Sequence, residues 1–441
     1  MNNQLEHLHL IINSAINSVK PSELITRKMM LEGNHLIVNN YKIDLEKHDK
    51  IFVLGTGKAS AFMAYEIESL LGDKINYGIV STKYGHSAPC KKIKIIESGH
   101  PIIDANSLKA GEEILNLAKE TTENDLVICL LSGGGSALLE KLPSEISLQE
   151  LQIIFNLLLN SGANIEEMNI VRRHLSKIKG GQLAAAIFPA TSVSLIISDV
   201  INDPIEAIAG GVTSPDPSTF KDALNILSKY DLIDLTPHNV LNYILDGVEG
   251  KNPETIKPNN KIFERTNNFI LGNNKEALLN AKTKAESLGY NTLIYSANIQ
   301  GEARVIGKFS AELAKKIFYE NKPLSPPACL LIGGETTVTI KGNGKGGRNQ
   351  ELVLSALCEM KNEKFGFLIA SVGTDGTDGP TDAAGAFVNH SIIDRSVELS
   401  LNPNSFLENN DSYNFFNNID GLIKTGPSGT NVMDIIVILV N

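Results

Sequence analysis

The stretch KGNGKGGRNQE at residues 341–351 carries the residue types best suited to chemistry in this chain. Its four glycines surround Lys345 and Arg348 and stand directly before an apolar segment. Glycine lets successive backbone N–H groups turn inward, a following helix adds its positive N-terminal end, and arginine binds phosphate or carboxylate oxygens with two donors. The stretch therefore predicts a site that binds an anion.

A second glycine loop follows an apolar strand pattern in the first half of the chain. Residues 125–139 read DLVICLLSGGGSALL, where an apolar run ends, three glycines turn, and a serine is placed to cap a helix. The expected phosphate contacts of this loop are Ser132, Gly133, Gly134, Gly135 and Ser136. Two anion-binding loops in one chain predict a polyanionic ligand such as a nucleotide.

The segment GTGKAS at residues 55–60 also joins a strand pattern to a helix pattern. Ser60 replaces the third glycine of a dinucleotide fingerprint, and Lys83 stands where an acid would hold a ribose, which disfavours NAD binding. Ala59 occupies the position where a Walker A loop needs serine or threonine. Lys58 is placed to meet a phosphoryl group as a mobile charge, although a solvated lysine at a helix start has the same pattern.

Carboxylates follow three further strand patterns. Asp199 comes directly after SVSLIIS and is well placed for chemistry. Asp375 and Asp378 lie among glycines in GTDGTDGPTD, and such carboxylates suit a hard cation like Mg²⁺, although both residue types are common in ordinary turns. Glu335 after two glycines and Lys179 before two glycines are candidate substrate ligands or helpers, and each also fits a structural role.

The histidines do not indicate a hydrolase. His100 and His174 are not accompanied by a G-x-S-x-G nucleophile motif. We therefore expect structural or substrate-contact roles for both.

Composition excludes several classes of protein. The net charge of −10 disfavours non-specific binding to nucleic acid, and no apolar run approaches the roughly 18 residues of a membrane helix. The four cysteines are scattered, and two lie in apolar runs, which disfavours a disulfide framework or a zinc site. We expect a cytoplasmic protein that binds neither membrane nor nucleic acid.

The elements that must position these residues alternate between strand and helix patterns. Apolar strand patterns in the first half lie at 50–54, 77–81, 92–98, 125–132 and 192–198. Strands this continuously apolar are typical of a parallel sheet covered on both faces. The polar stretch 246–268 is the best candidate for a linker.

The second half also has the pattern of an α/β domain. Its clearest strand patterns lie at 328–335, 366–376 and 433–440, and the first two end in polar loops with glycine. Ligands of open α/β sheets bind beyond such strand ends. The Asn-rich stretch 402–418 contains three phenylalanines and is therefore expected to be a packed insertion, with its role left open.

Eight motifs occur in an order that resembles the glycerate 2-kinase family with a MOFRL C-terminal domain. They are GTGKAS, SGGGSALL, SDVINDP, IAGGVTSPDPST, GGETTV, GKGGRNQE, GTDGTDGPTDAAGA and TGPSGTNVMDI. The resemblance implies two α/β domains with an active site in the cleft between them. The first, residues 1–250, would be Rossmann-like with a mostly parallel sheet. The second and smaller, residues 251–441, would contain the MOFRL region at about 326–438.

The resemblance also implies an activity, namely phosphorylation of D-glycerate by ATP and Mg²⁺ to 2-phosphoglycerate. It places the catalytic lysine and arginine at Lys58 and Arg348, with Asp199 as our candidate for orienting or deprotonating the substrate hydroxyl. The SGGGS loop would hold the nucleotide phosphates, and Asp375 and Asp378 would bind the metal. Further expected nucleotide contacts are Gly346, Gly347 and Asn349.

Two other functions stay open at this point. One is a hydroxypyruvate reductase that uses NAD(P)H, a name carried by some relatives, against which the broken dinucleotide fingerprint argues. The other is a nucleotide-binding module without catalytic activity, against which the combination of Lys58, Arg348 and the aspartates argues. Family members are often dimers, so a homodimer is an assembly to test.

Overall fold

The computed structural model describes residues 2–441, which form two compact domains. The N-terminal domain comprises Leu24–Leu271, and the C-terminal domain comprises Gly272–Asn441 together with the preceding segment up to Glu23. The division therefore lies beyond the position expected near residue 250. The reason is that the polar stretch packs within the N-terminal domain, where the Asp216 N–H donates to the Ile256 carbonyl.

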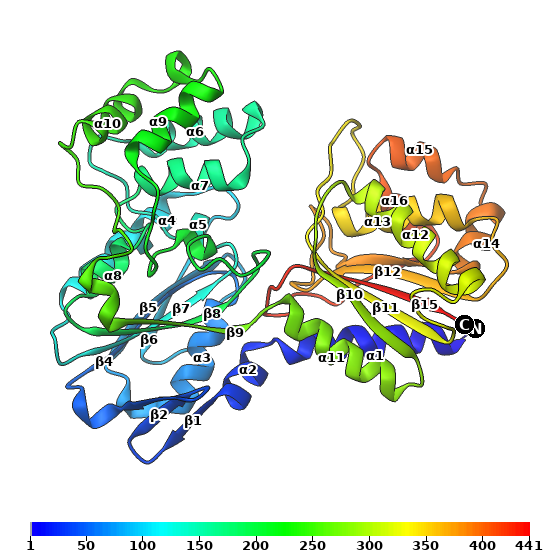
Figure 1. The fold of residues 1–441 in the computed structure, drawn as a ribbon, viewed down its shortest axis with the longest axis horizontal. Helices are drawn as coiled ribbons and strands as arrows, with labels where there is room; N and C mark the ends of the chain where they lie inside the picture. Colours follow the sequence, from blue (N-terminus) through cyan, green and yellow to red (C-terminus); the bar gives the residue numbers. More distant parts are fainter. Residues whose placement is uncertain (1) are drawn as a thin grey trace. The chain divides into compact units, whose positions relative to one another are not determined.

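A six-stranded sheet in the order β6-β5-β4-β7-β8-β9 forms the centre of the N-terminal domain (Figure 1). Its strands are β4 (Ile51–Thr56), β5 (Tyr77–Lys83), β6 (Ile93–Ser98), β7 (Leu126–Ser132), β8 (Thr191–Ile197) and β9 (Thr266–Gly272). The pairs from β6 to β8 are parallel, as the apolar runs predicted. Their carboxyl ends share one edge of the sheet, so the loops after these strands lie at that edge.

Helices cover both faces of this sheet and also form a separate group. One face carries α3 (Ser60–Leu71), and the other carries α4 (Ala105–Lys119), α5 (Gly135–Leu138) and α8 (Gln182–Ile187). The separate group has its own apolar core and consists of α6 (Leu148–Ser161), α7 (Ile165–His174), α9 (Phe220–Lys229) and α10 (His238–Val248). A small antiparallel sheet follows α2 (Pro21–Lys28) and contains β1 (Met29–Glu32), β2 (His35–Val38) and β3 (Tyr41–Asp44).

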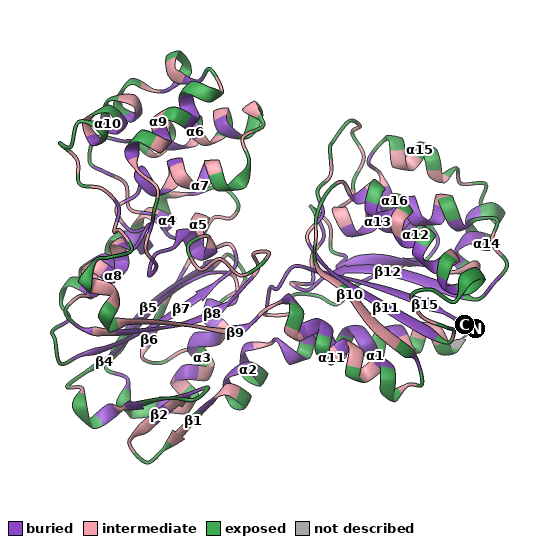
Figure 2. Ribbon diagram, in the orientation of Figure 1, coloured by how far each residue is buried: buried purple, intermediate pink, exposed green. Residues whose placement is uncertain are grey.

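The C-terminal domain contains a mixed sheet in the order β10-β11-β15-β12-β13-β14. Its strands are β10 (Asn291–Ile299), β11 (Ala328–Gly334), β12 (Phe367–Gly373), β13 (Gly385–Val388), β14 (Leu422–Ile423) and β15 (Asp434–Val440). β15 is antiparallel to both β11 and β12, so it begins where they end, and Asp434 pairs in register with Gly334 and Gly373. Every residue of β11, β12 and β15 is buried (Figure 2).

The helices of this domain lie on both faces of its sheet. They are α1 (Asn2–Ser18) and α11 (Asn274–Ser287) on one face and α12 (Ala303–Glu320) and α13 (Arg348–Met360) on the other, with α14 (His390–Glu398), α15 (Pro403–Glu408) and α16 (Ser412–Asn418) at the periphery. α1 comes first in the chain yet packs beside α11, where His7 Nδ1 lies 3.0 Å from the Tyr290 hydroxyl. The N-terminal helix therefore does not join the domain expected for residues 1–250.

The Asn-rich stretch is a packed part of the C-terminal domain, as expected. It forms α15 and α16, and Phe415 and Phe416 are fully buried. These two rings contact each other edge to face, with centroids 5.3 Å apart. The stretch is therefore anchored by apolar contacts.

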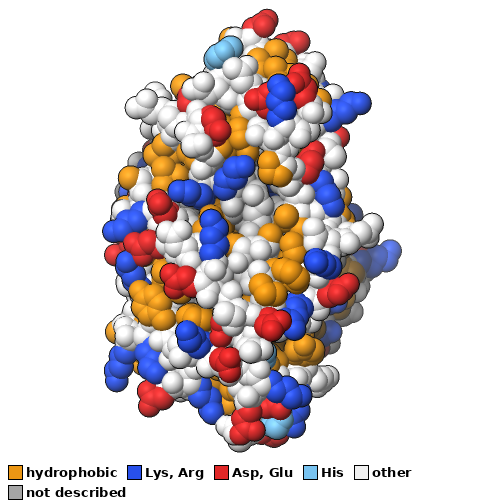
Figure 3. Space-filling view, turned by 90° about the vertical axis from the view of Figure 1, so that its left-hand side faces the viewer, with side chains coloured by type: hydrophobic (Ala, Val, Ile, Leu, Met, Phe, Trp, Pro, Cys, Tyr) orange, Lys and Arg blue, Asp and Glu red, His pale blue; other side chains and the backbone are white. Residues whose placement is uncertain are grey.

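The helices, one face of the surface and the cysteines complete the description of residues 2–441. Among residues 2–441, no helix is both long enough and apolar enough to cross a membrane. Basic, acidic and apolar side chains are interspersed on the face shown in Figure 3. All four cysteines are free thiols, and burial raises the pKa of Cys129 to about 12.

Candidate active site

Lys58 lies in the loop that follows β4 at the carboxyl edge of the N-terminal sheet. The Lys58 backbone N–H donates to the Gly133 carbonyl at 2.9 Å, and the Lys58 carbonyl oxygen lies 3.3 Å from His86 Nδ1. Gly57 has a φ of +134°, and a Cβ there would lie 2.2 Å from Ser132 Oγ, so only glycine fits. The loop after β4 is therefore fixed against the loop after β7, and the backbone of Lys58 makes one of the contacts between them.

The SGGGS loop, residues 132–136, follows β7 but is organised differently from the prediction. Its helix α5 begins at Gly135 with Gly134 as the N-cap, so Ser136 lies inside the helix and does not cap it. Ser132 is fully buried, and its Oγ accepts the Ala59 N–H at 3.0 Å. Gly133 and Gly135 are buried as well, whereas Gly134 and Ser136 are partly exposed. The predicted phosphate contact of this loop stays a prediction, and these last two residues are the accessible ones.

Asp199 lies at the same edge of the sheet, just beyond β8. Ile197, the last residue of that strand, pairs in register with Ser132, and Asp199 is partly buried two residues later. The register places Asp199 at the same sheet edge as the SGGGS loop, and its catalytic role stays a prediction.

Lys179 is a buried residue and does not line an open surface. Its side chain is 1% exposed, and its ammonium group pairs with Glu140, which is fully buried, and donates to the Leu139 carbonyl at 3.2 Å. Burial lowers the pKa of Lys179, and Glu140 offsets part of that effect. The proposed substrate contact of Lys179 therefore has no support from its position, which fits a structural ion pair.

Replacing Lys179 with methionine is expected to lower the free energy of unfolding by about 3 kcal/mol or more, because Glu140 would be left buried without its partner. Denaturant unfolding would measure the change, with the exposed Lys221→Met as the matched control. Normal unfolding combined with lost turnover would return Lys179 to a substrate-binding role.

Arg348, the first residue of α13, lies between two carboxylates in the C-terminal domain. Its Nε and Nη2 donate to Asp434 at 2.6 and 2.9 Å, and its Nη1 pairs with Glu335 Oε1 at 2.6 Å. The Asp434 side chain is 6% exposed and that of Glu335 is 43% exposed. Asp434 therefore fixes the plane of the guanidinium from inside the domain, and Glu335 holds its outer side.

The charge of Arg348 is stabilised by this arrangement. Burial opposes the charged form, but Asp434 and then Glu335 outweigh it and raise the pKa of Arg348. The guanidinium is a permanent cation with one outward N–H pair bonded to an exposed partner. Such a group can bind an anion that displaces Glu335.

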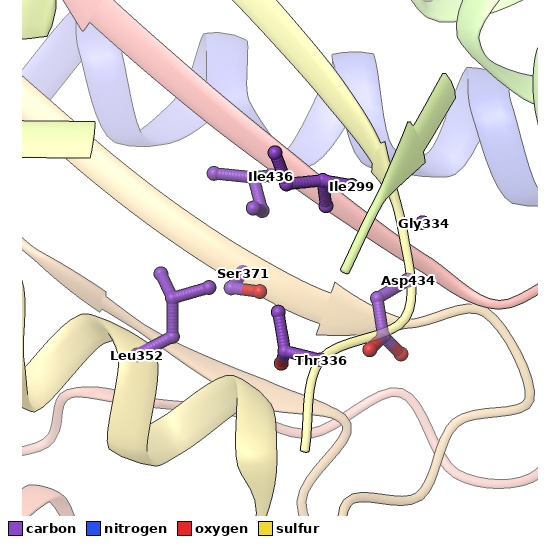
Figure 4. A pocket seen from close by; sticks show the side chains of 7 residues that line it. All are labelled: Ile299, Gly334, Thr336, Leu352, Ser371, Asp434 and Ile436. Carbon is purple, nitrogen blue, oxygen red and sulfur yellow. The ribbon is translucent and has the colours of Figure 1, made fainter. Parts of the chain in front are cut away.

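A narrow crevice lies beside Asp434 at the meeting point of β11, β12 and β15 (Figure 4). It is lined by Ile299, Gly334, Thr336, Leu352, Ser371, Asp434 and Ile436. The two isoleucine side chains lie together, apart from the Asp434 carboxylate. The crevice has no room for a water molecule, so the side chains around Asp434 are closely packed.

Asp378 caps α13 from a distant loop. It is 2% exposed, and its two oxygens accept the backbone N–H groups of Asn349 and Gln350 at 3.1 and 2.9 Å. Burial raises the pKa of Asp378 to about 6, and these two N–H groups offset part of that effect. The start of α13 is thus occupied by a carboxylate of the protein itself, which differs from the predicted open anion site.

The expected metal ligands do not form a cluster. Among residues 2–441, no group of three or more His, Cys, Asp or Glu side chains is arranged to hold a metal ion. Asp378 does not fit a direct ligand because both oxygens bind α13. Asp375, which accepts from the Thr377 hydroxyl at 3.0 Å, is partly exposed and stays the better candidate.

The glycine-rich loop, residues 341–347, also differs from the predicted anion cradle. Asn410 Oδ1 accepts the N–H groups of Lys341 and Gly342 at 2.8 and 3.0 Å, and Asp411 accepts that of Lys345 at 2.9 Å. Asn409 Oδ1 accepts a further N–H, from Asn343, at 3.1 Å. The Asn-rich stretch therefore clamps this loop, which answers the open question about its role.

The other three residues predicted to contact a nucleotide here, Gly346, Gly347 and Asn349, are closely packed against other parts of the C-terminal domain. A Cβ at Gly346 would lie 2.2 Å from Ser412 Oγ, and one at Gly347 would lie 2.3 Å from Asp378. Asn349 is 1% exposed, and its side chain accepts from Ser371 Oγ at 2.5 Å. Their contacts with a nucleotide stay predictions, and close packing already explains these residue types.

Asn410 connects the clamp to α13 as well, because its Nδ2 donates to Glu351 at 2.9 Å. Replacing Asn410 with alanine is expected to destabilise the C-terminal domain by about 1–3 kcal/mol, since two N–H groups and one carboxylate oxygen of Glu351 lose their partner. It should also lower kcat more than it raises KM, because Arg348 lies one residue beyond the loop. Thermal unfolding and steady-state kinetics would measure both, with Asn404→Ala at the exposed start of α15 as the control. Wild-type values for both quantities would contradict the clamp.

Two known families match separate parts of the chain. A domain of unknown function, DUF4147, matches residues 7–245, and the MOFRL family matches residues 328–434. The D-glycerate 2-kinase of Thermotoga maritima is 43% identical over 394 residues, which cover 89% of this chain and 91% of that protein. A protein of Agrobacterium vitis, provisionally named hydroxypyruvate reductase, is 38% identical over 406 residues, which cover 92% and 90%.

A solved structure agrees with these matches. The crystal structure of a glycerate kinase from Thermotoga maritima superposes with a TM-score of 0.86 at 40% identity and covers the whole of both chains. The fold, both domain families and the relatives thus lead to the same assignment. The chain belongs to the glycerate kinase family, in which it combines a DUF4147 region with a MOFRL region.

Proposed function

We propose that this chain is a glycerate 2-kinase that transfers the γ-phosphoryl group of ATP to the 2-hydroxyl of D-glycerate. The observation that carries the proposal is the 43% identity to a D-glycerate 2-kinase over nearly the full length of both proteins. The positions of Lys58 and Arg348 support it, because Lys58 closely follows the buried strand β4 and Arg348 is held by Asp434, the first residue of the buried strand β15. The four free thiols support a reducing cytoplasm as its location.

In this proposal the cationic side chains neutralise the charge that develops during transfer. ATP enters as its Mg²⁺ complex, which is written here as a substrate, and Asp375 is the carboxylate best able to approach it. Lys58 stabilises the transferring phosphoryl group, and Arg348 exchanges Glu335 for a substrate anion while Asp434 keeps the guanidinium in place. Asp199 orients the 2-hydroxyl and accepts its proton.

The test is ADP release from Mg²⁺-ATP in the presence of D-glycerate, with the product identified by phosphorus NMR. We expect ADP that depends on glycerate and a signal of 2-phosphoglycerate, and both should be lost in Lys58→Ala. A signal of 3-phosphoglycerate would reassign the acceptor hydroxyl.

The relative named hydroxypyruvate reductase gives the same experiment a second arm. Oxidation of NADH with hydroxypyruvate, without any ADP release, would replace the kinase by a reductase. ATP binding without turnover of any hydroxy acid would leave a nucleotide-binding module.

A further inference from the structure

His100 lies directly against the SGGGS loop. A Cβ built on Gly134 would lie 2.9 Å from both Nε2 and Cδ2 of His100 and 3.3 Å from Cγ of Lys58. The imidazole edge and the stem of Lys58 therefore share the face of Gly134 that a side chain would otherwise occupy. No larger residue fits at position 134, whose φ is +77°.

The segment that carries His100 is held from both sides. Ser98, the last residue of β6, pairs in register with Lys83, and its Oγ donates to the Leu138 carbonyl of α5 at 2.9 Å. The next residue, Gly99, donates its N–H to Asp104, the N-cap of α4. His100 is partly exposed, and the backbone before it is fixed by these bonds.

This arrangement gives His100 a chemical use that packing alone does not require. Gly134 is one of the two accessible residues of the SGGGS loop, and the stem of the Lys58 side chain lies against the same face of Gly134. An anionic oxygen that meets the Lys58 ammonium above Gly134 would also meet the Nε2 edge of the imidazole. With its proton on Nε2, the ring is an N–H donor. A hydrogen bond to a charged oxygen is stronger than one between two neutral groups.

We propose that His100 is a further anion-binding residue, which donates from Nε2 to an oxygen of the substrate held by Lys58. The proposal rests on the proposed kinase function and adds a residue to the same site. The oxygen belongs to a phosphate of ATP or to the carboxylate of glycerate. The two sources share one chemistry and differ in which substrate loses affinity.

The experiment compares His100→Ala and His100→Gln with the wild type and with His238→Ala, an exposed histidine on α10 that serves as the matched control. Glutamine retains an N–H donor near the position of Nε2. Steady-state kinetics gives kcat and both KM values, and titration calorimetry gives the Kd of ATP without turnover. Thermal unfolding confirms that each variant is folded.

We expect kcat/KM to fall roughly tenfold or more in His100→Ala and to recover in part in His100→Gln, because one charge-assisted hydrogen bond is lost and then restored. Added imidazole should restore part of the activity of His100→Ala. A rise in the KM and Kd of ATP assigns the bond to a phosphate, and a rise in the KM of glycerate alone assigns it to the carboxylate.

Two results would overturn the proposal. One is a His100→Ala enzyme within about threefold of the wild type. The other is equal loss in both variants, together with a lower unfolding temperature and no rescue by imidazole, which would make His100 a packing residue. If the wild type fails to phosphorylate glycerate, the proposed function fails separately, and calorimetry with ATP and with glycerate, each compared between the wild type and His100→Ala, still decides the role of His100.

Discussion

Arg348→Ala is expected to lower kcat for glycerate phosphorylation by about 100-fold or more, the typical effect of losing one preorganised donor to developing charge. Arg348 is held by the two hydrogen bonds that it donates to Asp434, so its orientation needs no reorganisation during the reaction. Arg348→Lys should lose nearly as much activity, because an ammonium group cannot bind Asp434 with two donors and still face outward. Coupled ADP release would measure these rates.

The Arg348 prediction needs a control for folding. Removing the guanidinium leaves Asp434 nearly buried without a partner, which should destabilise the domain by about 2 kcal/mol, below the effect of a fully buried pair because Arg348 is one-third exposed. The double variant Arg348→Ala/Asp434→Asn removes that unpaired charge. Activity should stay low in the double variant while stability recovers, and recovery of activity would mean that Arg348 acts only through folding. Arg395→Ala is the matched control, because Arg395 forms an exposed ion pair with Asp420.

Most of the fold follows from local sequence patterns. Buried parallel strands are apolar along their whole length, so β4, β5, β7 and β8 were predicted with small errors at their ends. Lys58 and Arg348 could also be found locally, because each stands among glycines in a short segment of the sequence. Local patterns do not state which sheet a helix covers, and α1 therefore joined the other domain.

The environment of Arg348 depends on contacts that no local pattern contains. Asp434 reads as the first residue of an apolar strand, and only its register between Gly334 and Gly373 places it beside Arg348. The partner of the glycine-rich loop lies 66 residues further along, as the bond from Asn343 to Asn409 shows. A glycine run that packs tightly against asparagine side chains has the same sequence pattern as one that binds an anion. Burial and partners distinguish the two, and both require the folded chain.

His100 was assigned a structural or substrate-contact role because it lacked a nucleophile motif. Its position beside Gly134 arises from the parallel order β6-β5-β4-β7, which brings the ends of distant strands to one edge. A sequence signal did exist, since His100 follows a strand pattern and a glycine as Lys58 does. The loops after the five parallel strands share one sheet edge, which places His100 and Lys58 in the same group of candidate residues.

Lys58→Met is expected to lower kcat by about 100-fold or more while leaving stability nearly unchanged. The stem of Lys58 packs against Gly134, since a Cβ built on Gly134 would lie 3.3 Å from the Lys58 Cγ. Methionine keeps this apolar stem and removes only the charge. The backbone bond from Lys58 N–H to Gly133 does not depend on the side chain, so the loop should keep its conformation. The exposed Lys91→Met is the matched control, and steady-state kinetics with thermal unfolding would measure both effects.

The comparison between Lys58→Met and Lys58→Ala separates charge from packing. If the ammonium group stabilises the transferring phosphoryl, both variants should lose kcat equally, because both lack the charge. If the stem mainly supports Gly134 and the ring of His100, methionine should retain most of the activity and alanine should not. Near-normal kcat in Lys58→Met would therefore remove Lys58 from the chemistry and leave Arg348 as the principal cation of the proposed reaction.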